Sequence, residues 1–212
     1  MEAYYHFAAH FRWHLNAFLR AIKEVPQLVQ MAMQHTPGFV AWYTPRRHAL
    51  AADVLMRHLA KRRDQLVHQR MLLPGSTASL GVADYGGMRL GVGVRIDPLV
   101  DSDAAMERFV RTTRASTDPF GILMEDEDTL PCIEREWGLA EFPGDNVLDV
   151  CARAWINTAD LVREVYGWVG VTLEPHGLPC RHESAAVRLR FYPRERLAKD
   201  DFRGVALAPA AP

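Results

Sequence analysis

Three histidines recur at four-residue intervals near the N-terminus, at His6, His10 and His14. On a helix this spacing places the rings in one stripe, and imidazoles at i and i+4 can chelate Zn, Ni or Cu. A strand would also put the three on one face. Glu2 is the only nearby acid, and the sequence lacks the His-Glu-x-x-His pattern of zinc enzymes. The spacing therefore favours a polar, half-buried face, with metal binding by these histidines as the alternative.

A thiol, an imidazole and a carboxylate stand close together at Cys180, His182 and Glu183. Side chains of adjacent residues rarely converge on one point, and cysteine nucleophiles usually take their base from elsewhere in the fold. The preceding Pro179 and the arginine-rich segment that follows predict a loop here. We therefore expect no catalytic residue and no cofactor, and Cys180 with His182 is the alternative catalytic pair.

Charge is sorted along a chain whose net charge is only −1. Residues 97–149 contain fourteen acidic and four basic side chains, whereas residues 46–70 contain seven basic and two acidic ones. The basic segment lacks the interleaved aromatic residues on which single-stranded bases stack. Because the chain also has no basic excess, we expect no nucleic-acid partner. The basic residues should form a solvated helix face, paired in part with the protein's own acids.

The densest acidic run consists of Glu125, Asp126, Glu127 and Asp128, with Leu123, Met124 and Leu130 nearby. It lacks the Asp-x-Asp-x-Asp-Gly spacing of a calcium loop. A solvated loop is the default interpretation. The alternative is a docking surface for a basic partner, because acidic side chains beside apolar anchors combine electrostatic steering with a buried centre.

Length and composition indicate an ordinary globular protein of 212 residues, about half of them apolar. No apolar run is long enough to cross a membrane, and the N-terminus lacks the basic and apolar regions of a signal peptide. Three widely spaced cysteines fit a reducing compartment. We therefore expect a cytoplasmic protein without a membrane partner, with a single α+β domain over residues 1–205 and a disordered tail over residues 206–212.

The N-terminal half is predicted to contain helices followed by a hairpin. Residues 3–14 fit both strand alternation and a helical stripe, and their aromatic content favours a strand that leads into a helix. Further helices should begin at Pro26 and at Thr44-Pro45, since proline suits the first helical turn. Two alternating runs around the paired glycines at 86–87 predict a β-hairpin over residues 78–96.

The C-terminal half is predicted to mix helices and strands. Asp101-Ser102-Asp103 should cap a helix, and a long connection should then run to about Gly144. Asp145-Asn146 should cap an amphipathic helix that ends near Gly167. Strands are expected at residues 168–173 and 187–191. Without a regular βαβ rhythm, these elements predict the α+β class, with helices packed on an antiparallel sheet.

Two segments carry a family resemblance. Phe39-Val40-Ala41-Trp42-Tyr43, followed by Arg46-Arg47-His48-Ala49-Leu50, resembles the F-x-x-W-Y … A-L element of bacterial polymorphic-toxin immunity proteins. The group concerned is paired with restriction-endonuclease-like toxins, some delivered by type VI secretion. The hairpin that ends in Val94-Arg95 is similar to that family's following strands, although Ile96-Asp97 replaces the Cys-Gly of the pattern. The resemblance covers residues 15–96. It implies a cytoplasmic antitoxin that binds one nuclease and has no catalytic residue of its own.

The leading hypothesis is therefore a non-enzymatic immunity protein that neutralises a cognate toxin or another basic protein. Its expected partner-binding residues are Glu125, Asp126, Glu127, Asp128, Trp42 and Tyr43, the last two with a structural role as the alternative. Competing hypotheses are a metal protein or small enzyme built on the histidine set or on Cys180 and His182. A further one is an assembly subunit or homodimer that packs its apolar N-terminal segment against another chain.

Overall fold

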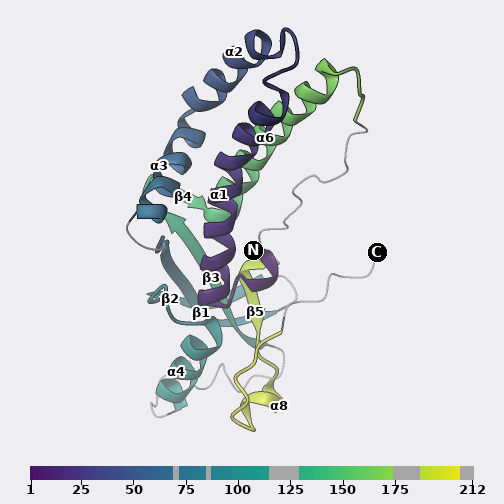
Figure 1. Ribbon diagram of the computed structural model, residues 1–212. Helices are drawn as coiled ribbons and strands as arrows, with labels where there is room; N and C mark the ends of the chain where they lie inside the picture. The colour runs from purple at the N-terminus through teal and green to yellow at the C-terminus, as the bar shows by residue number, and fades with distance from the viewer. Residues whose placement is uncertain (69–71, 85–86, 115–128, 174–186, 206–212) are drawn as a thin grey trace. The chain divides into compact units, whose positions relative to one another are not determined.

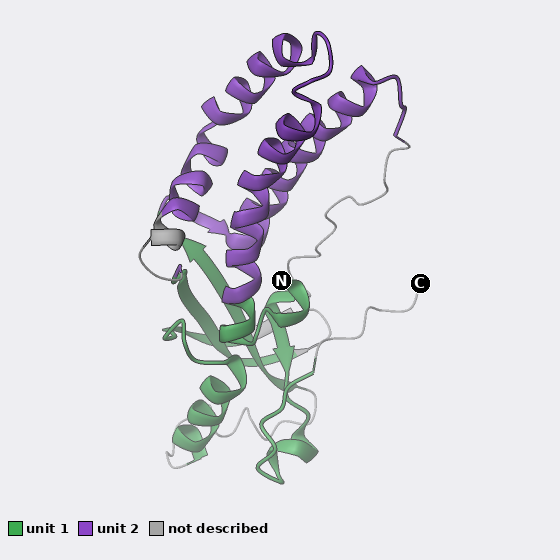
Figure 2. Cartoon of the chain, in the orientation of Figure 1, with its two compact units in different colours: residues 1–11, 73–140, 182–212 green, residues 12–72, 141–181 purple. Residues whose placement is uncertain are grey.

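The computed structural model describes residues 1–68, 72–84, 87–114, 129–173 and 187–205 (Figure 1). Helices and a five-stranded antiparallel sheet confirm the α+β class. The chain divides into two compact units, shown in Figure 2. Unit 1 comprises residues 1–11, 73–140 and 182–212, and unit 2 comprises residues 12–72 and 141–181. The expectation of one domain over residues 1–205 stays a prediction, and residues 206–212 lie outside the described part.

The sheet contains β1 (Gly75–Asp84), β2 (Gly87–Arg95), β3 (Leu130–Leu139), β4 (Phe142–Asn146) and β5 (Leu189–Phe191). Its strand order is β2-β1-β3-β4, and β5 pairs with β3. The predicted hairpin is confirmed by the antiparallel pairing of β1 with β2, in which Leu80 lies opposite Val92. The expected long connection to Gly144 is wrong beyond Thr129, because β3 and β4 occupy that stretch.

The first long helix, α1, runs from Ala8 to Met33 after a short 3-10 helix, η1 (Glu2–Tyr4). The favoured strand within residues 3–14 is therefore wrong, and so is a helix start at Pro26, which lies inside α1. The competing helical interpretation holds because Phe11, Leu15, Leu19 and Ile22 are all buried at helical spacing.

Two helices occupy residues 39–68 where one was expected. They are α2 (Phe39–Ala52) and α3 (Val54–His68). Pro45 lies inside α2, and the Thr44 hydroxyl donates to the Val40 carbonyl at 2.7 Å instead of capping a helix. The break falls at Asp53, whose carboxylate accepts from the backbone N–H of Met56 at 2.9 Å. Asp53 therefore caps the start of α3, in the way typical of short acidic side chains.

Three further helices are described, α4 (Ser102–Arg114), α6 (Val147–Trp168) and α8 (Arg194–Leu197). The Asn146 side chain accepts from the Leu148 N–H at 3.0 Å, which confirms the predicted start of α6. The predicted strand at residues 168–173 is wrong, since Trp168 is helical and no described residue after it forms a strand before β5. Gly170, with φ of +78°, rather than Gly167, takes the left-handed conformation after the helix.

Each unit has its own core. In unit 1, α4 and the sheet enclose a cluster that includes Leu80, Met106, Val110 and Ile133. In unit 2, Phe39 and Tyr43 of α2 pack with Leu161 and Val165 of α6. Within the described residues, no helix combines the length and apolar character that a membrane span requires.

Candidate functional site

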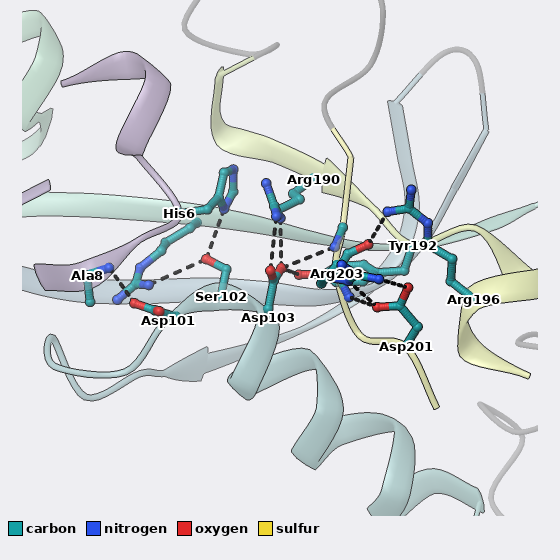
Figure 3. A network of polar contacts seen from close by, with 12 residues as sticks. His6, Ala8, Asp101, Ser102, Asp103, Arg190, Tyr192, Arg196, Asp201 and Arg203 are labelled. Atoms are coloured by element: carbon teal, nitrogen blue, oxygen red, sulfur yellow. Dashed lines mark hydrogen bonds and ion pairs between the residues drawn. The ribbon is translucent and has the colours of Figure 1, made fainter. Parts of the chain in front are cut away.

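A buried polar network in unit 1 joins the N-terminal segment to the start of α4 (Figure 3). The two ring nitrogens of His6 lie 2.9 Å from the Ser102 hydroxyl and 3.0 Å from the Val187 carbonyl. A carbonyl only accepts, so Nε2 carries the proton and donates to Val187, while Nδ1 accepts from the Ser102 hydroxyl. The backbone N–H of Ser102 also donates to the His6 carbonyl at 3.0 Å.

The two aspartates that flank Ser102 bind other segments of the same unit. Asp101 accepts from the Ala8 N–H at 2.6 Å, at the first residue of α1. Asp103 accepts from Arg190 and from the Tyr192 hydroxyl (Figure 3). The backbone N–H of Gly204 also donates to this carboxylate, at 3.3 Å. One three-residue segment therefore anchors the start of α1, β5 and the residues after β5.

Arg135 of β3 is the charged centre of the network and is completely buried. Its guanidinium donates to Ser76 at 3.1 Å and to the Val100 carbonyl at 2.8 Å, and it lies 3.9 Å above the Trp137 ring. Burial lowers the pKa of Arg135 to about 10, so the side chain stays cationic at neutral pH. The nearby charge of Asp101 opposes this shift by favouring the cation.

The Ser102–His6 pair has the hydroxyl, the base and the orienting acceptor that nucleophilic catalysis uses. However, Ser102 is completely buried, so a substrate cannot reach its hydroxyl. Burial, together with the positive charge of Arg190, lowers the pKa of His6 to about 3. A general base works best with a pKa near the operating pH. The arrangement is therefore suited to holding the N-terminal segment in place rather than to proton transfer.

The structure does not bring the three N-terminal histidines together as ligands. Both nitrogens of His6 are hydrogen-bonded inside unit 1, whereas His10 and His14 are exposed. His10 stacks on Tyr4 with ring centroids 5.3 Å apart. Among the described residues, no three His, Cys, Asp or Glu side chains form a group that could hold a metal ion. Cys180, His182 and Glu183 lie outside the described residues.

Trp42 and Tyr43 lie in the aromatic cluster of unit 2. Tyr43 is 1% exposed, and its hydroxyl donates to the Pro26 carbonyl at 2.8 Å. Trp42 is half-buried, packs beside Trp168 and lies beneath the Arg46 guanidinium at 4.1 Å. Tyr43 therefore has a structural position, while Trp42 keeps part of its ring accessible. The acidic residues Glu125, Asp126, Glu127 and Asp128 lie outside the described part of the chain.

Many of the sorted charges are neutralised inside their own unit. In the basic segment, Arg62 pairs with Glu141 and Arg46 pairs with Glu164 at 2.7 Å. Lys23 of α1 and Arg63 both bind Asp64. In the acidic segment, Glu107, Glu136 and Asp145 each pair with an arginine. The expectation that basic residues pair with the protein's own acids is confirmed for Arg62, whose partner belongs to the acidic stretch.

An apolar stripe lies on the solvent side of α6 in unit 2. It consists of Trp155, Ala159, Val162 and Tyr166 of the helix and of Val169 directly after its end, spaced by four and three residues. Trp155, Tyr166 and Val169 are 45%, 42% and 45% exposed, and the other two are half-buried. The buried face of the same helix carries a second set, which includes Cys151, Leu161 and Val165. The predicted amphipathic pattern of this helix does not separate the two sets, because they are adjacent on the helix surface.

The described residues define an α+β protein. Its buried polar network connects segments of unit 1, and its exposed apolar stripe lies on the helix α6. The family model of bacteriophage lambda protein ea47 matches residues 1–182, so the chain belongs to that family. No curated protein and no solved structure matches the chain. The family match does not bear on the resemblance to immunity proteins, which stays a prediction.

Proposed function

We propose that this protein is a non-enzymatic binding protein, and that it serves as an immunity protein that neutralises a cognate protein toxin. The observation that carries the proposal is the exposed apolar stripe on α6, residues 155–169. Large aromatic side chains at the centre of an interface supply most of its binding energy. Trp155 and Tyr166 are the anchors of the proposed interface.

The state of the Ser102–His6 pair supports a binding role over a catalytic one. Its hydroxyl is sealed from solvent, and its imidazole has a pKa far below neutrality. The buried pair therefore has a structural role, and the proposed binding function is assigned to exposed residues.

The acidic run at residues 125–128 supports a basic partner. It is the densest acidic run in the sequence, and a block of like charges attracts an oppositely charged partner over a long range. Exposed charges mainly accelerate encounter, whereas buried apolar contacts set the lifetime of the complex. The proposal therefore assigns steering to the acidic run and anchoring to the stripe on α6.

The test is co-expression with the product of the adjacent gene. We expect that product to be toxic alone and harmless with this protein. Trp155→Arg should abolish protection, because it places a charge in the centre of the proposed interface. Ile156→Arg is the matched control, since Ile156 is 49% exposed on the same helix but lies outside the stripe. A harmless neighbour, toxicity that this protein does not relieve, or equal effects of the two variants would refute the proposal.

The steering role has its own measurement. Reversing the four charges at residues 125–128 should slow association with the purified neighbour and reduce the salt dependence of the on-rate. The off-rate should change little, because the apolar anchors are intact. An on-rate that does not change at low salt would place the steering charges elsewhere.

A further inference from the structure

β2 forms an open edge of the sheet in unit 1, since β1 is its one neighbour among the described strands. The Ile96 N–H donates to the Ser76 carbonyl at 3.1 Å. This bond shows which residues of β2 direct their backbone groups toward β1. In an antiparallel pair the bonding residues alternate. Leu90, Val92 and Val94 therefore direct their backbone groups toward β1. Gly91, Gly93 and Arg95 direct theirs away from it.

The side chains along this edge leave the outward backbone groups accessible. Gly91 and Gly93 carry no side chain, and a Cβ built on Gly93 would meet no atom within 4 Å. On the opposite face of the strand, Leu90 and Val92 are each 41% exposed beside the core of unit 1. Exposed edges are usually protected by proline, by inward-pointing charges or by very short strands. Residues 90–94 have none of these protections.

We propose that the β2 edge binds an extended segment of a partner protein by antiparallel strand addition, with an acidic residue of that segment opposite Arg95. Arg95 is exposed, and no ion pair joins it to another described residue. Opposite charges directly across two strands stabilise the pairing, whereas like charges weaken it. Addition of a strand would satisfy the outward N–H and C=O groups of Gly91, Gly93 and Arg95.

The sequence of the edge argues against a second copy of this chain as the occupant. In symmetric antiparallel registers centred on Gly91, Val92 or Gly93, Arg95 of each copy stands opposite position 87, 89 or 91 of the other copy. The sequence has glycine, arginine and glycine at these positions, so no such register supplies an acid. An acidic strand from a different protein gives Arg95 an opposite charge.

The two faces of the edge also define the pattern of the incoming strand. A hollow of about 390 Å³ lies beside Gly93 and Arg95, and Thr77, Ser79 and Glu134 also line it. Positions of the added strand opposite Gly93 and Arg95 face this polar hollow. Positions opposite Leu90 and Val92 face apolar side chains. The partner segment should therefore alternate polar and apolar residues, and its acid should lie at the N-terminal end of the pairing.

The experiment uses two synthetic peptides and the full chain labelled with ¹⁵N. The probe is acetyl-Glu-Val-Thr-Val-Thr-Val-amide, and its control has lysine in place of glutamate. The acidic peptide should slow hydrogen exchange of the Gly91 and Gly93 amides and should bind roughly fivefold more tightly than the basic peptide. Equal binding of both peptides, or binding that leaves these two amides unprotected, would overturn the proposal.

Three variants separate the edge from other surfaces. Gly93→Pro should block binding while preserving the β1–β2 hairpin, because the N–H it removes points away from β1. Arg95→Glu should reverse the preference between the two peptides. Arg108→Glu changes the net charge equally at an exposed position of α4 and should leave the preference unchanged. Self-association that Gly93→Pro abolishes would instead identify a second copy as the occupant. This site lies in unit 1 and does not depend on the proposed function of α6.

Discussion

Asp103 and Arg190 form a two-point ion pair, with the carboxylate accepting at 2.7 Å from Nε and at 3.0 Å from Nη2 of the guanidinium. Both side chains are mostly buried, and the Tyr192 hydroxyl donates to the same carboxylate at 2.9 Å. The pair joins α4 to β5, which are distant in the sequence. It therefore holds the short strand β5 in unit 1.

Replacing Asp103 with asparagine should destabilise the protein by about 2–4 kcal/mol, because it leaves the mostly buried Arg190 cation without its counter-charge. Denaturant unfolding measures the loss. Glu107→Gln is the control, since the exposed i,i+4 pair of Glu107 with Arg111 contributes less than about 0.5 kcal/mol. Similar losses in the two variants would mean that the Asp103 pair has no special structural role.

The low pKa of His6 predicts a dependence of stability on pH. Because burial lowers the folded-state pKa to about 3 from the ordinary value of 6.5, only the unfolded chain binds this proton between those limits. The contribution of His6 to stability is therefore fully present above pH 6.5 and is lost as the pH falls toward 3. The expected slope is about 1.4 kcal/mol per pH unit.

Unfolding measured from pH 7 to pH 4 tests this dependence. His6→Gln should flatten the slope, because it removes the titrating group from both states. His10→Gln is the matched control at an exposed position and should keep the wild-type slope. A slope that does not differ between the His6 variant and the wild type would assign the acid sensitivity to other groups.

Two substitutions of Arg135 compare the effect of its charge on stability with the effect of its hydrogen-bonding shape. Arg135→Lys keeps the cation but cannot reproduce the guanidinium's bonds to Ser76 and the Val100 carbonyl. We expect it to cost about 3–5 kcal/mol, as for a buried charge without partners. Arg135→Met fills a similar volume with no charge and should cost less. Thermal or denaturant unfolding of both variants checks the order, and greater stability of the lysine variant would contradict it.

The sequence predicted the elements whose signals are local. The hairpin followed from alternation around paired glycines, and the start of α6 followed from the capping side chain of Asn146. β3 was missed because Arg135 occupies a core-facing position between two glutamates, which hides the period of two. The break at Asp53 was missed because Thr44-Pro45 offered a stronger but misleading helix-start signal.

The buried network could not be predicted from the sequence. His6 bonds to Ser102, ninety-six residues away, and its second nitrogen bonds to the backbone of Val187. Neither contact leaves a spacing pattern, because the fold creates both. The regular interval of the three histidines suggested a shared function, yet only His6 enters the core. Similarly, periodicity identified α6 as amphipathic but could not show which of its two apolar stripes is buried.

The close approach of β1 to β2 gives the last prediction. A Cβ added to Gly81 would lie 1.8 Å from the Leu90 carbonyl oxygen and 2.7 Å from the Gly91 Cα, both backbone atoms that cannot rotate away. Gly81→Ala should therefore displace β2 and destabilise the protein by about 1–3 kcal/mol, as overpacking does elsewhere. Gly93→Ala is the control on the facing strand, where the new methyl group meets open space. Because alanine restricts the unfolded chain, that variant should be neutral or up to about 1 kcal/mol more stable. Denaturant unfolding measures the free energy of unfolding of both variants. Equal values would contradict the prediction, because they would mean that β1 and β2 accommodate a methyl group at Gly81 without loss of stability.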